Sequence, residues 1–390
     1  MNKPTVGRVV HYRETADADA LAAVVCAVLE DGSLALSIFN ANGHPSGARE
    51  VLHEDELPRI RASVDRHHGN PLAHSDNAPG PSGEIYGNAT QLTCRRCGWN
   101  YALDGALGDA PGGNPPGDGY DLLPVHCDVW AGFVFVNFDS QPRQSLREFL
   151  GPMVTALDDY PFHKLTERYD WIAHNNSNWK IFADAFQEYY HVPSLHTQQV
   201  PPEVRDPNAG FTCGHFQLDG PHRLVSTAGT RRWLLAPEYM YPIERVTHSG
   251  LVGPWRTPDL GELPVGLNPG NIEPWGISNF QIFPNLEVLF YGGWYLLYRY
   301  WPTSHNTHRF EAYTYFHPAR TVRERIEHEV AAVVLKEFAL QDAGMLGGTQ
   351  AALEYDIIDE FPLNDQEILV RHLHKVAVDW VDDYRAEKGV

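Results

Sequence analysis

The chain has 390 residues, enough for two or three domains with sizeable cores, which excludes a mini-protein held together by disulfides. Its 30 Lys and Arg against 50 Asp and Glu give a net charge of −20, which disfavours a binder of nucleic acid or anionic lipid. Hydrophobic residues reach 43%, but no apolar run approaches the ~20 residues that cross a bilayer and none resembles a signal peptide, so we expect a cytoplasmic protein with no membrane partner.

The first 140 residues are typical of short strands separated by loops. Apolar and polar residues alternate up to about residue 60, with turn signals at an Asp-Gly and an Asn-Gly pair, which predicts a small meander of strands. Loops rich in Gly, Pro and polar residues are expected at 66–88 and 108–119. Strands are expected over the intervening apolar segments: 6–12, 22–29, 33–39, 90–94, 99–103 and a buried run at 129–138.

The rest of the chain mixes helices with strands. Aromatic residues at three- and four-residue intervals predict one helix over 177–196 that Pro193 stops, and a long helix should begin at Thr321 and end at the Gly-Gly pair 347–348. Residues 200–275 are rich in Pro and Gly and are expected to form long loops. Further elements are expected as helices over 145–157 and 365–386 and strands over 288–302 and 308–318. This order predicts an α+β chain, in which helices of the second half pack on one face of an antiparallel sheet.

The segment 177–196 carries a set of residues able to bind metal. Asp184, Glu188 and His191 are spaced i, i+4 and i+7, which would place them on one face of the predicted helix. His196 follows beyond the break, so two imidazoles can converge on one ion, and iron held by two histidines and a carboxylate keeps positions open for O₂ and substrate. With 20 histidines in the chain, such a pair also arises by chance, so spacing alone leaves both interpretations open.

The wider segment NWKIFADAFQEYYHVPSLH resembles the mononuclear iron motif of the Rieske-type non-haem iron oxygenases, the α subunits of aromatic-ring hydroxylases. The resemblance implies that His191 and His196 are iron ligands. It also implies that Glu188 links the iron to the electron-donating cluster of a neighbouring subunit. The segment EFALQDAGMLGGTQAAL is similar to the family's Asp followed eight residues later by Gln, which implies Asp342 as the third ligand and Gln350 as the motif's Gln.

Two more segments, VWAGFVFVNFD at 129–139 and FPNLEVLFY at 283–291, are similar to the family, so the resemblance covers about residues 85–385. It implies an α+β fold in three parts: a small β-domain of unclear origin at 1–65, a Rieske-like β-domain at 66–140, and a helix-grip catalytic domain of antiparallel sheet and helices at 141–390.

The cluster site is where the chain departs from the family, which binds a [2Fe–2S] cluster with two Cys on one iron and two His on the other. The segment CRRCGWNYALDGAL provides Cys94, but Cys97 stands where the family has His. The position of the family's other Cys-x-His pair falls on His74 and Asp76. These residues could hold an altered cluster, one zinc ion, or no metal, and the three alternatives stay open. Five cysteines with one close pair argue against a disulfide framework.

The resemblance implies an oxidoreductase that uses Fe(II), O₂ and electrons from a ferredoxin or flavin reductase to hydroxylate an aromatic or alicyclic compound. It implies a homotrimer, because electrons cross between subunits in this family. We expect a small hydrophobic substrate, in a pocket walled by the aromatic stretch 288–301. Asp184 is expected either to orient a ligand His or to be solvated. The alternative function, favoured by Cys97, is a cluster-deficient homologue that binds a small molecule or a single metal ion.

Overall fold

The structure is a computed structural model. It describes residues 9–12, 21–28, 34–39, 45–48, 91–94, 96–102, 104–113, 119–199, 213–228, 242–247, 259–273, 275–358 and 360–389. The chain divides into two compact units, Met1–Phe149 and Leu150–Val390. The expected three-part division at residues 65 and 140 stays a prediction.

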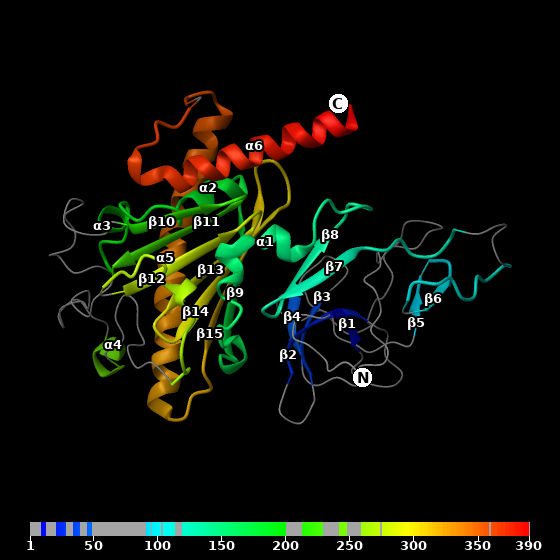
Figure 1. The fold of residues 1–390 in the computed structure, drawn as a ribbon, viewed down its shortest axis with the longest axis horizontal. Helices are drawn as coiled ribbons and strands as arrows, with labels where there is room; N and C mark the ends of the chain where they lie inside the picture. The colour runs from blue at the N-terminus through cyan, green and yellow to red at the C-terminus, as the bar shows by residue number, and fades with distance from the viewer. Residues whose placement is uncertain are drawn as a thin grey trace. The chain divides into compact units, whose positions relative to one another are not determined.

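The first unit contains short antiparallel strands. A four-stranded sheet has the order β1-β2-β3-β4, which is the meander that the alternating pattern predicts (Figure 1). Two separate strand pairs follow, β5 with β6 and β7 with β8. The bounds are β1 Val9–Tyr12, β2 Leu21–Val28, β3 Leu34–Phe39, β4 Pro45–Ala48, β5 Gln91–Thr93, β6 Asn100–Ala102, β7 His126–Trp130 and β8 Phe133–Asn137.

The prediction of one buried strand at 129–138 is wrong, because this run belongs to a hairpin. Ala131 and Gly132 both have positive φ, at 51° and 92°, and turn the chain between β7 and β8. Two central residues with positive φ are typical of the tight turns whose twist matches paired antiparallel strands.

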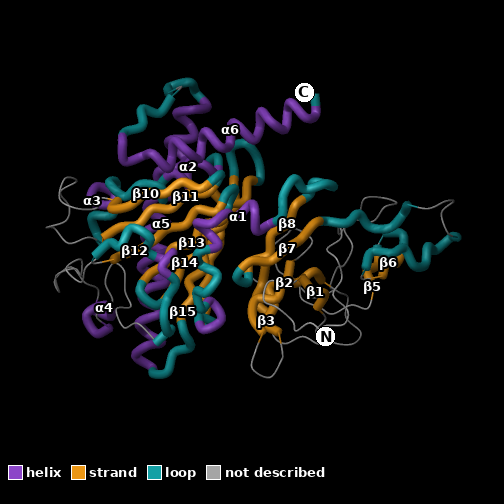
Figure 2. The backbone as a smooth tube through the Cα atoms, in the orientation of Figure 1, coloured by secondary structure: helices purple, strands orange, loops and turns teal. Residues whose placement is uncertain are grey.

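The second unit is built on one antiparallel sheet of seven strands in the order β10-β11-β12-β13-β14-β15-β9 (Figure 2). Consecutive strands from β10 to β15 are neighbours, and β9, the first in sequence, pairs with β15 at the far edge. The bounds are β9 Glu167–Asn175, β10 Cys213–Asp219, β11 His222–Ala228, β12 Trp275–Ile282, β13 Leu286–Tyr291, β14 Trp294–Pro302 and β15 His308–Phe316.

Helices pack on this sheet through a core rich in aromatic residues. Phe182 of α2, Leu335 and Leu346 of α5 and Leu373 of α6 are buried in one cluster with residues from β11 to β15. Figure 1 shows α5, the longest helix, running across the sheet, with α6 close to β11. The helices are α1 Leu146–Thr155, α2 Trp179–Asp184, α3 Val192–Leu195, α4 Pro242–Thr247, α5 Val322–Glu354 and α6 Ile368–Lys388, with short 3₁₀ turns at Phe162–Lys164, Val265–Leu267 and Asp365–Glu367.

This architecture confirms the expected α+β class with helices over an antiparallel sheet. Among the helices of the described residues, none has the length and apolar character needed to cross a bilayer.

Several element boundaries differ from the sequence expectation. The segment 200–275, expected to be loops, contains the paired strands β10 and β11. The expected strand 288–302 is divided by a turn at 292–293 into β13 and β14. Helix α5 continues past the Gly-Gly pair 347–348 to Glu354. Buried side chains on both sides of that pair, Leu346 and Gln350, keep the helix on the sheet, and their packing outweighs the roughly 1 kcal/mol that each Gly costs.

Candidate metal centre

Three side chains from two distant segments bring their metal-binding atoms together. His191 lies just before α3 and His196 just after it, whereas Asp342 lies in the middle of α5. The two histidine Nε2 atoms are 3.2 Å apart, and Asp342 Oδ1 lies 3.6 Å from His191 Nε2 and 3.4 Å from His196 Nε2. In the described part of the chain, this is the one group of His, Cys and acidic side chains close enough to hold an ion together.

The triangle has the size that one first-row metal ion requires. Ligand atoms about 2.1 Å from a common ion lie about 3–3.5 Å from one another. The carboxylate of Asp342 is buried away from water, and its Oδ1 has no hydrogen-bond partner. A buried, unpartnered carboxylate oxygen facing two imidazole nitrogens fits a divalent cation, because only a charge or a donor would compensate for its lost hydration.

The outer nitrogen of each histidine contacts an oxygen, which directs the inner nitrogen at the triangle. His191 Nδ1 lies 2.5 Å from Glu188 Oε1, and His196 Nδ1 lies 2.6 Å from Gln341 Oε1. An Nδ1–H that donates to these oxygens leaves the lone pair of Nε2 for a metal ion. Burial lowers the pKa of the His191 imidazole, but the hydrogen bond and charge of Glu188 raise it by more, so the pKa lies above its usual value.

The chain reaches this geometry because the expected helix over 177–196 is broken, contrary to the sequence prediction. Helix α2 ends at Asp184, a turn follows, and the four-residue helix α3 begins at Val192. Pro193, which was expected to stop the long helix, lies instead in the first turn of α3. The amide N–H groups of Leu195 and His196 donate to the carbonyls of His191 and Val192. One short helical turn therefore places the two histidines on the same side.

The two carboxylates predicted near the histidines have different surroundings. Glu188 contacts His191 through both oxygens, since Oε2 also accepts from the His191 amide N–H at 3.2 Å. Asp184 contacts neither histidine of the triangle. It accepts from Gln187 Nε2 and pairs with His374 Nε2 of α6 at 2.8 Å, so its histidine partner lies outside the triangle, and its expected role stays a prediction.

Sequence reasoning missed Gln341, a glutamine beside the site. Gln341 contacts His196 and donates from Nε2 to Gln199 Oε1 at 3.1 Å. Its position directly before Asp342 was the signal available in the sequence. Gln350 was singled out without a contact, and its Oε1 accepts at 2.7 Å from the backbone N–H of Asn178, the residue that caps α2. This bond ties the start of α2 to α5.

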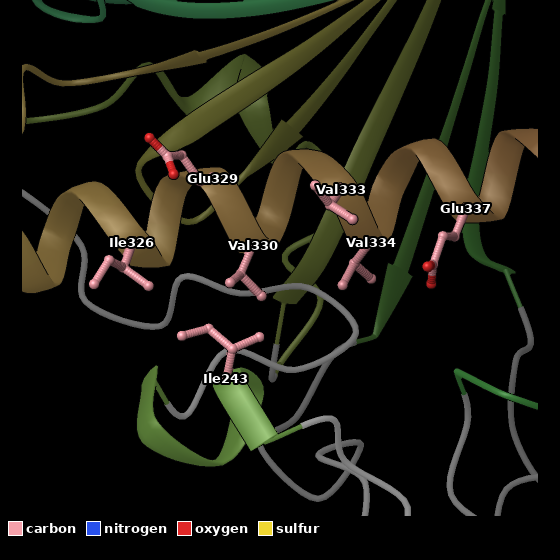
Figure 3. A pocket seen from close by; sticks show the side chains of 7 residues that line it. All are labelled: Ile243, Ile326, Glu329, Val330, Val333, Val334 and Glu337. Carbon is pink, nitrogen blue, oxygen red and sulfur yellow. The ribbon is translucent and has the colours of Figure 1, made fainter.

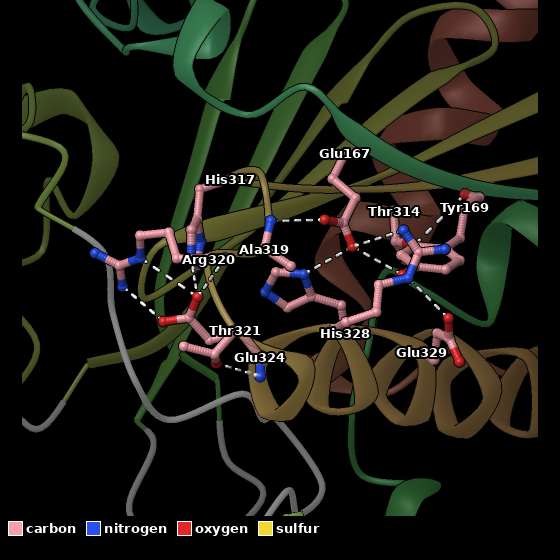
Figure 4. A network of polar contacts seen from close by, with 11 residues as sticks. Glu167, Tyr169, Thr314, His317, Ala319, Arg320, Thr321, Glu324, His328 and Glu329 are labelled. Atoms are coloured by element: carbon pink, nitrogen blue, oxygen red, sulfur yellow. Dashed lines mark hydrogen bonds and ion pairs between the residues drawn. The ribbon is translucent and has the colours of Figure 1, made fainter.

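Helix α5 is fixed in position near its first turns by polar contacts to β9 (Figure 4). The hydroxyl of Thr321 accepts from the Glu324 N–H and caps the helix, which begins at this residue as the sequence predicts. Buried His328 places Nδ1 2.9 Å from Glu167 Oε1 of β9, and Glu167 Oε2 accepts from the Ala319 N–H. These contacts fix the N-terminal part of α5, and Asp342 lies about four turns after His328.

The structure does not assemble a Rieske ligand set from the described residues. Cys94 is buried and Cys97 half-buried, in a tight turn where the Gly98 N–H donates to the Cys94 carbonyl at 2.7 Å and Gly98 has a φ of +75°. His74 and Asp76 lie outside the described residues. Within the described ranges no third or fourth ligand joins the two thiols, so neither a two-Cys, two-His cluster set nor a four-ligand zinc set is formed there.

A hollow of about 350 Å³ lies elsewhere, between α4 and the first half of α5 (Figure 3). Its lining is apolar, including Ile243 and Val333, with Glu329 and Glu337 as its charged residues. None of the triangle residues lines this hollow.

A comparison with protein-family models matches the part of the chain that contains the triangle. Residues 162–383, which include both histidines, Asp342 and the whole seven-stranded sheet, match the family model described as the ring hydroxylating alpha subunit (catalytic domain). The chain belongs to this family.

The curated relatives match only part of this chain. The carnitine monooxygenase oxygenase subunit of Escherichia coli (strain K12) is 29% identical over 170 residues, which are 40% of this chain and 43% of that protein. The chloroplastic choline monooxygenase of Spinacia oleracea is 30% identical over 122 residues, 28% of this chain and 27% of that protein. The chain thus matches about two-fifths of the length of the first of these relatives.

Solved structures resemble this family member over most of its length. A quaternary ammonium Rieske monooxygenase, CntA in complex with L-carnitine, has a TM-score of 0.54 and 15% identity, covering 94% of this chain and 88% of that chain. Naphthalene 1,2-dioxygenase from Rhodococcus sp. bound to indole has a TM-score of 0.58 and 14% identity, covering 97% and 89%. At these identities the likeness concerns the fold.

Proposed function

We propose that the chain is the oxygenase subunit of a Rieske-type non-haem iron oxygenase, in which His191, His196 and Asp342 hold one iron(II) ion. The observation that carries the proposal is the triangle of two Nε2 atoms and the unpartnered, buried Asp342 Oδ1. Iron bound by two histidines and a carboxylate keeps coordination positions open and so supplies O₂ activation beside a substrate.

The protein's part is to orient the ligands and keep the site dry. Glu188 holds the Nδ1 proton of His191, and Gln341 that of His196, so both Nε2 lone pairs stay directed at one point. The ring of Phe338 packs 4.6 Å from that of His196 and covers it with apolar surface. We also propose Glu188 as the carboxylate through which electrons pass between subunits of a homotrimer, since it already contacts a ligand histidine.

We propose a quaternary ammonium compound as the substrate class. The curated relatives named for carnitine and choline support this choice. Aromatic rings gather on the sheet face that packs against α2 and α5, including Tyr291 and Trp294, stacked 4.0 Å apart. Aromatic faces attract quaternary ammonium groups through cation–π interaction. An aromatic or alicyclic substrate is the second candidate, because the same rings can stack on a flat apolar molecule.

The test is to load the protein anaerobically with Fe(II), remove excess metal and measure iron and acid-labile sulfide. We expect retained iron beyond the amount matched by sulfide. A chemical reductant then takes the place of a ferredoxin or flavin reductase. With carnitine or choline as substrate, the protein should consume O₂ and convert the amine to a product that carries an added oxygen atom. Turnover of naphthalene but of neither amine would replace the substrate class, and protein without iron after loading would overturn the proposal.

A second function is favoured by Cys97, which stands where the family has His. A chain that lacks the electron-input cluster would bind a small molecule or hold iron without turnover. Sulfide analysis separates the two: retained iron with no sulfide and no O₂ uptake would favour this binding function, whereas sulfide in proportion to a two-iron cluster would favour the oxygenase.

A further inference from the structure

The turn between α2 and His191 is held by side chains of the sheet. After α2 ends at Asp184, the carbonyl of Phe186 accepts from Asn279 Nδ2 at 2.8 Å and from Gln281 Nε2 at 3.1 Å. Both donors lie on β12, more than 90 residues further along the chain. A carbonyl that is already occupied by two sheet donors does not need the i+4 amide, so these contacts stabilise the turn in place of a continued helix.

The direction of the Asn279 amide is set by Glu287 of β13. One amide nitrogen has two N–H groups, and Asn279 Nδ2 lies 2.6 Å from Glu287 Oε1 and 2.8 Å from the Phe186 carbonyl oxygen. Turning the amide over would put Oδ1 against the Phe186 carbonyl oxygen, which can only accept. Asn279 Oδ1 instead remains buried without a hydrogen-bond partner, which costs stability. The hydrogen bonds from Nδ2 to Phe186 and Glu287 offset this cost.

Glu287 and Gln281 are themselves fixed. The hydroxyl of Tyr300 on β14 donates to Glu287 Oε2 at 2.7 Å, and Arg223 Nε on β11 donates to Gln281 Oε1 at 3.1 Å. Glu287 is 2% exposed and Gln281 is 4% exposed. Four adjacent strands therefore supply one buried polar cluster, and two of its members, Asn279 and Gln281, donate to the turn. The cluster consists of Arg223, Asn279, Gln281, Glu287 and Tyr300.

We propose that Asn279 and Gln281 are positioning residues for the iron-binding segment, and that Glu287 acts through Asn279 by orienting its amide. Phe186 stands two residues before Glu188, which contacts His191, so its carbonyl sets where the carboxylate and the histidine lie. The proposal rests on the proposed function in one respect, because it takes the triangle to be a metal site.

The experiment changes donors into acceptors without changing shape. Glu287→Gln keeps an oxygen for Asn279 and a group for Tyr300, so it is the matched control. The double variant Asn279→Asp/Glu287→Gln reverses the bond between the two side chains, preserves the formal net charge, and removes the N–H groups that Asn279 directs at the Phe186 carbonyl and the Tyr189 hydroxyl. Gln281→Glu independently removes the second donor and keeps the partner of Arg223. Ser226→Ala serves as a stability control, because it removes a buried hydrogen bond to Ser278, whose side chain points to the opposite face of β12 from that of its neighbour Asn279.

Two readouts on the full chain separate the possible results. In metal-free protein, amide hydrogen exchange of the peptide over 185–191 should be faster in the double variant and in Gln281→Glu than in Glu287→Gln and Ser226→Ala. The affinity for Co(II), followed by its absorption in competition with a chelator, should fall about tenfold in the same two variants. Unchanged exchange and affinity in either of them would overturn the proposal. Failure of the unmodified protein to bind Co(II) or Fe(II) would instead contradict the proposed function, and the exchange result would still decide the positioning role.

Discussion

Replacing Asp342 by asparagine tests the metal centre at its buried carboxylate. The substitution preserves the shape of the side chain and removes the negative charge of the triangle's single carboxylate. A four-ligand zinc site contributes about 10–16 kcal/mol of binding free energy, so one ligand accounts for about 2.5–4 kcal/mol. At 1.4 kcal/mol for each factor of ten, the affinity for Fe(II) should fall about 10²–10³-fold.

The same substitution should not destabilise the metal-free protein. Asp342 Oδ1 is buried without a hydrogen-bond partner, and an unsatisfied buried polar group costs about 1–3 kcal/mol. An amide N–H at this position would have the Nε2 atoms of His191 and His196 as acceptors, 3.6 and 3.4 Å from the present oxygen. We therefore expect the melting temperature of metal-free Asp342→Asn to equal or exceed that of the unmodified protein, by about 2–4 °C for each kcal/mol gained.

The assay is a pair of measurements on each protein: Fe(II) affinity under anaerobic competition with a chelator, and thermal unfolding after metal removal. A substitution that simply damaged the core would lower both affinity and melting temperature. Opposite changes, weaker binding with undiminished metal-free stability, are the signature of a ligand. Wild-type affinity in Asp342→Asn would refute the assignment, and so would a metal-free melting temperature several degrees lower.

Three further changes probe the surroundings of the site. Glu188→Gln keeps a hydrogen-bond acceptor but removes the charge beside His191, and we expect Fe(II) affinity to fall about 10–100-fold, which the same chelator competition measures. Burial raises the pKa of Glu287 from 4.5 to about 8, so the unfolded chain ionises first and Glu287 makes the fold less stable as the pH rises between these values. Denaturant unfolding should show Glu287→Gln gaining stability relative to the unmodified protein from pH 4.5 to 8, and a constant difference would contradict the burial argument. Thr321→Ala removes the cap of α5 and should cost about 1 kcal/mol in the same unfolding assay, with no loss predicted for Val322→Ala beside it, whose side chain is exposed.

Local patterns predicted much of the fold because the elements concerned carry their own signals. Thr321 begins α5 with a side-chain cap, and alternating residues predicted the N-terminal meander. The proposed metal ligands His191, His196 and Asp342 were identified by likeness to a family motif. Their spacing alone could not distinguish a site from a chance pair, since Asp342 approaches only after the helix has packed on the sheet.

The features that sequence could not predict depend on distant partners. The break after Asp184 is stabilised by Asn279 and Gln281, which no window around residue 184 contains. The contact between Asp184 and His374 likewise joins α2 to α6 across the second unit. Strand β11 was missed because its central residues are buried on both faces and so lack the alternation that identifies a half-exposed strand.

Two neighbouring residues of α5 hold both nitrogens of one imidazole: Gln341 contacts His196 Nδ1, and Asp342 faces His196 Nε2. The same helix is fixed near its start through His328. Each helical residue turns the next by about 100°, so one residue inserted or deleted between His328 and Gln341 would carry both side chains off the histidine. The length of this stretch of helix is therefore fixed, and natural homologues that keep the His191, His196 and Asp342 triangle should preserve it without gaps.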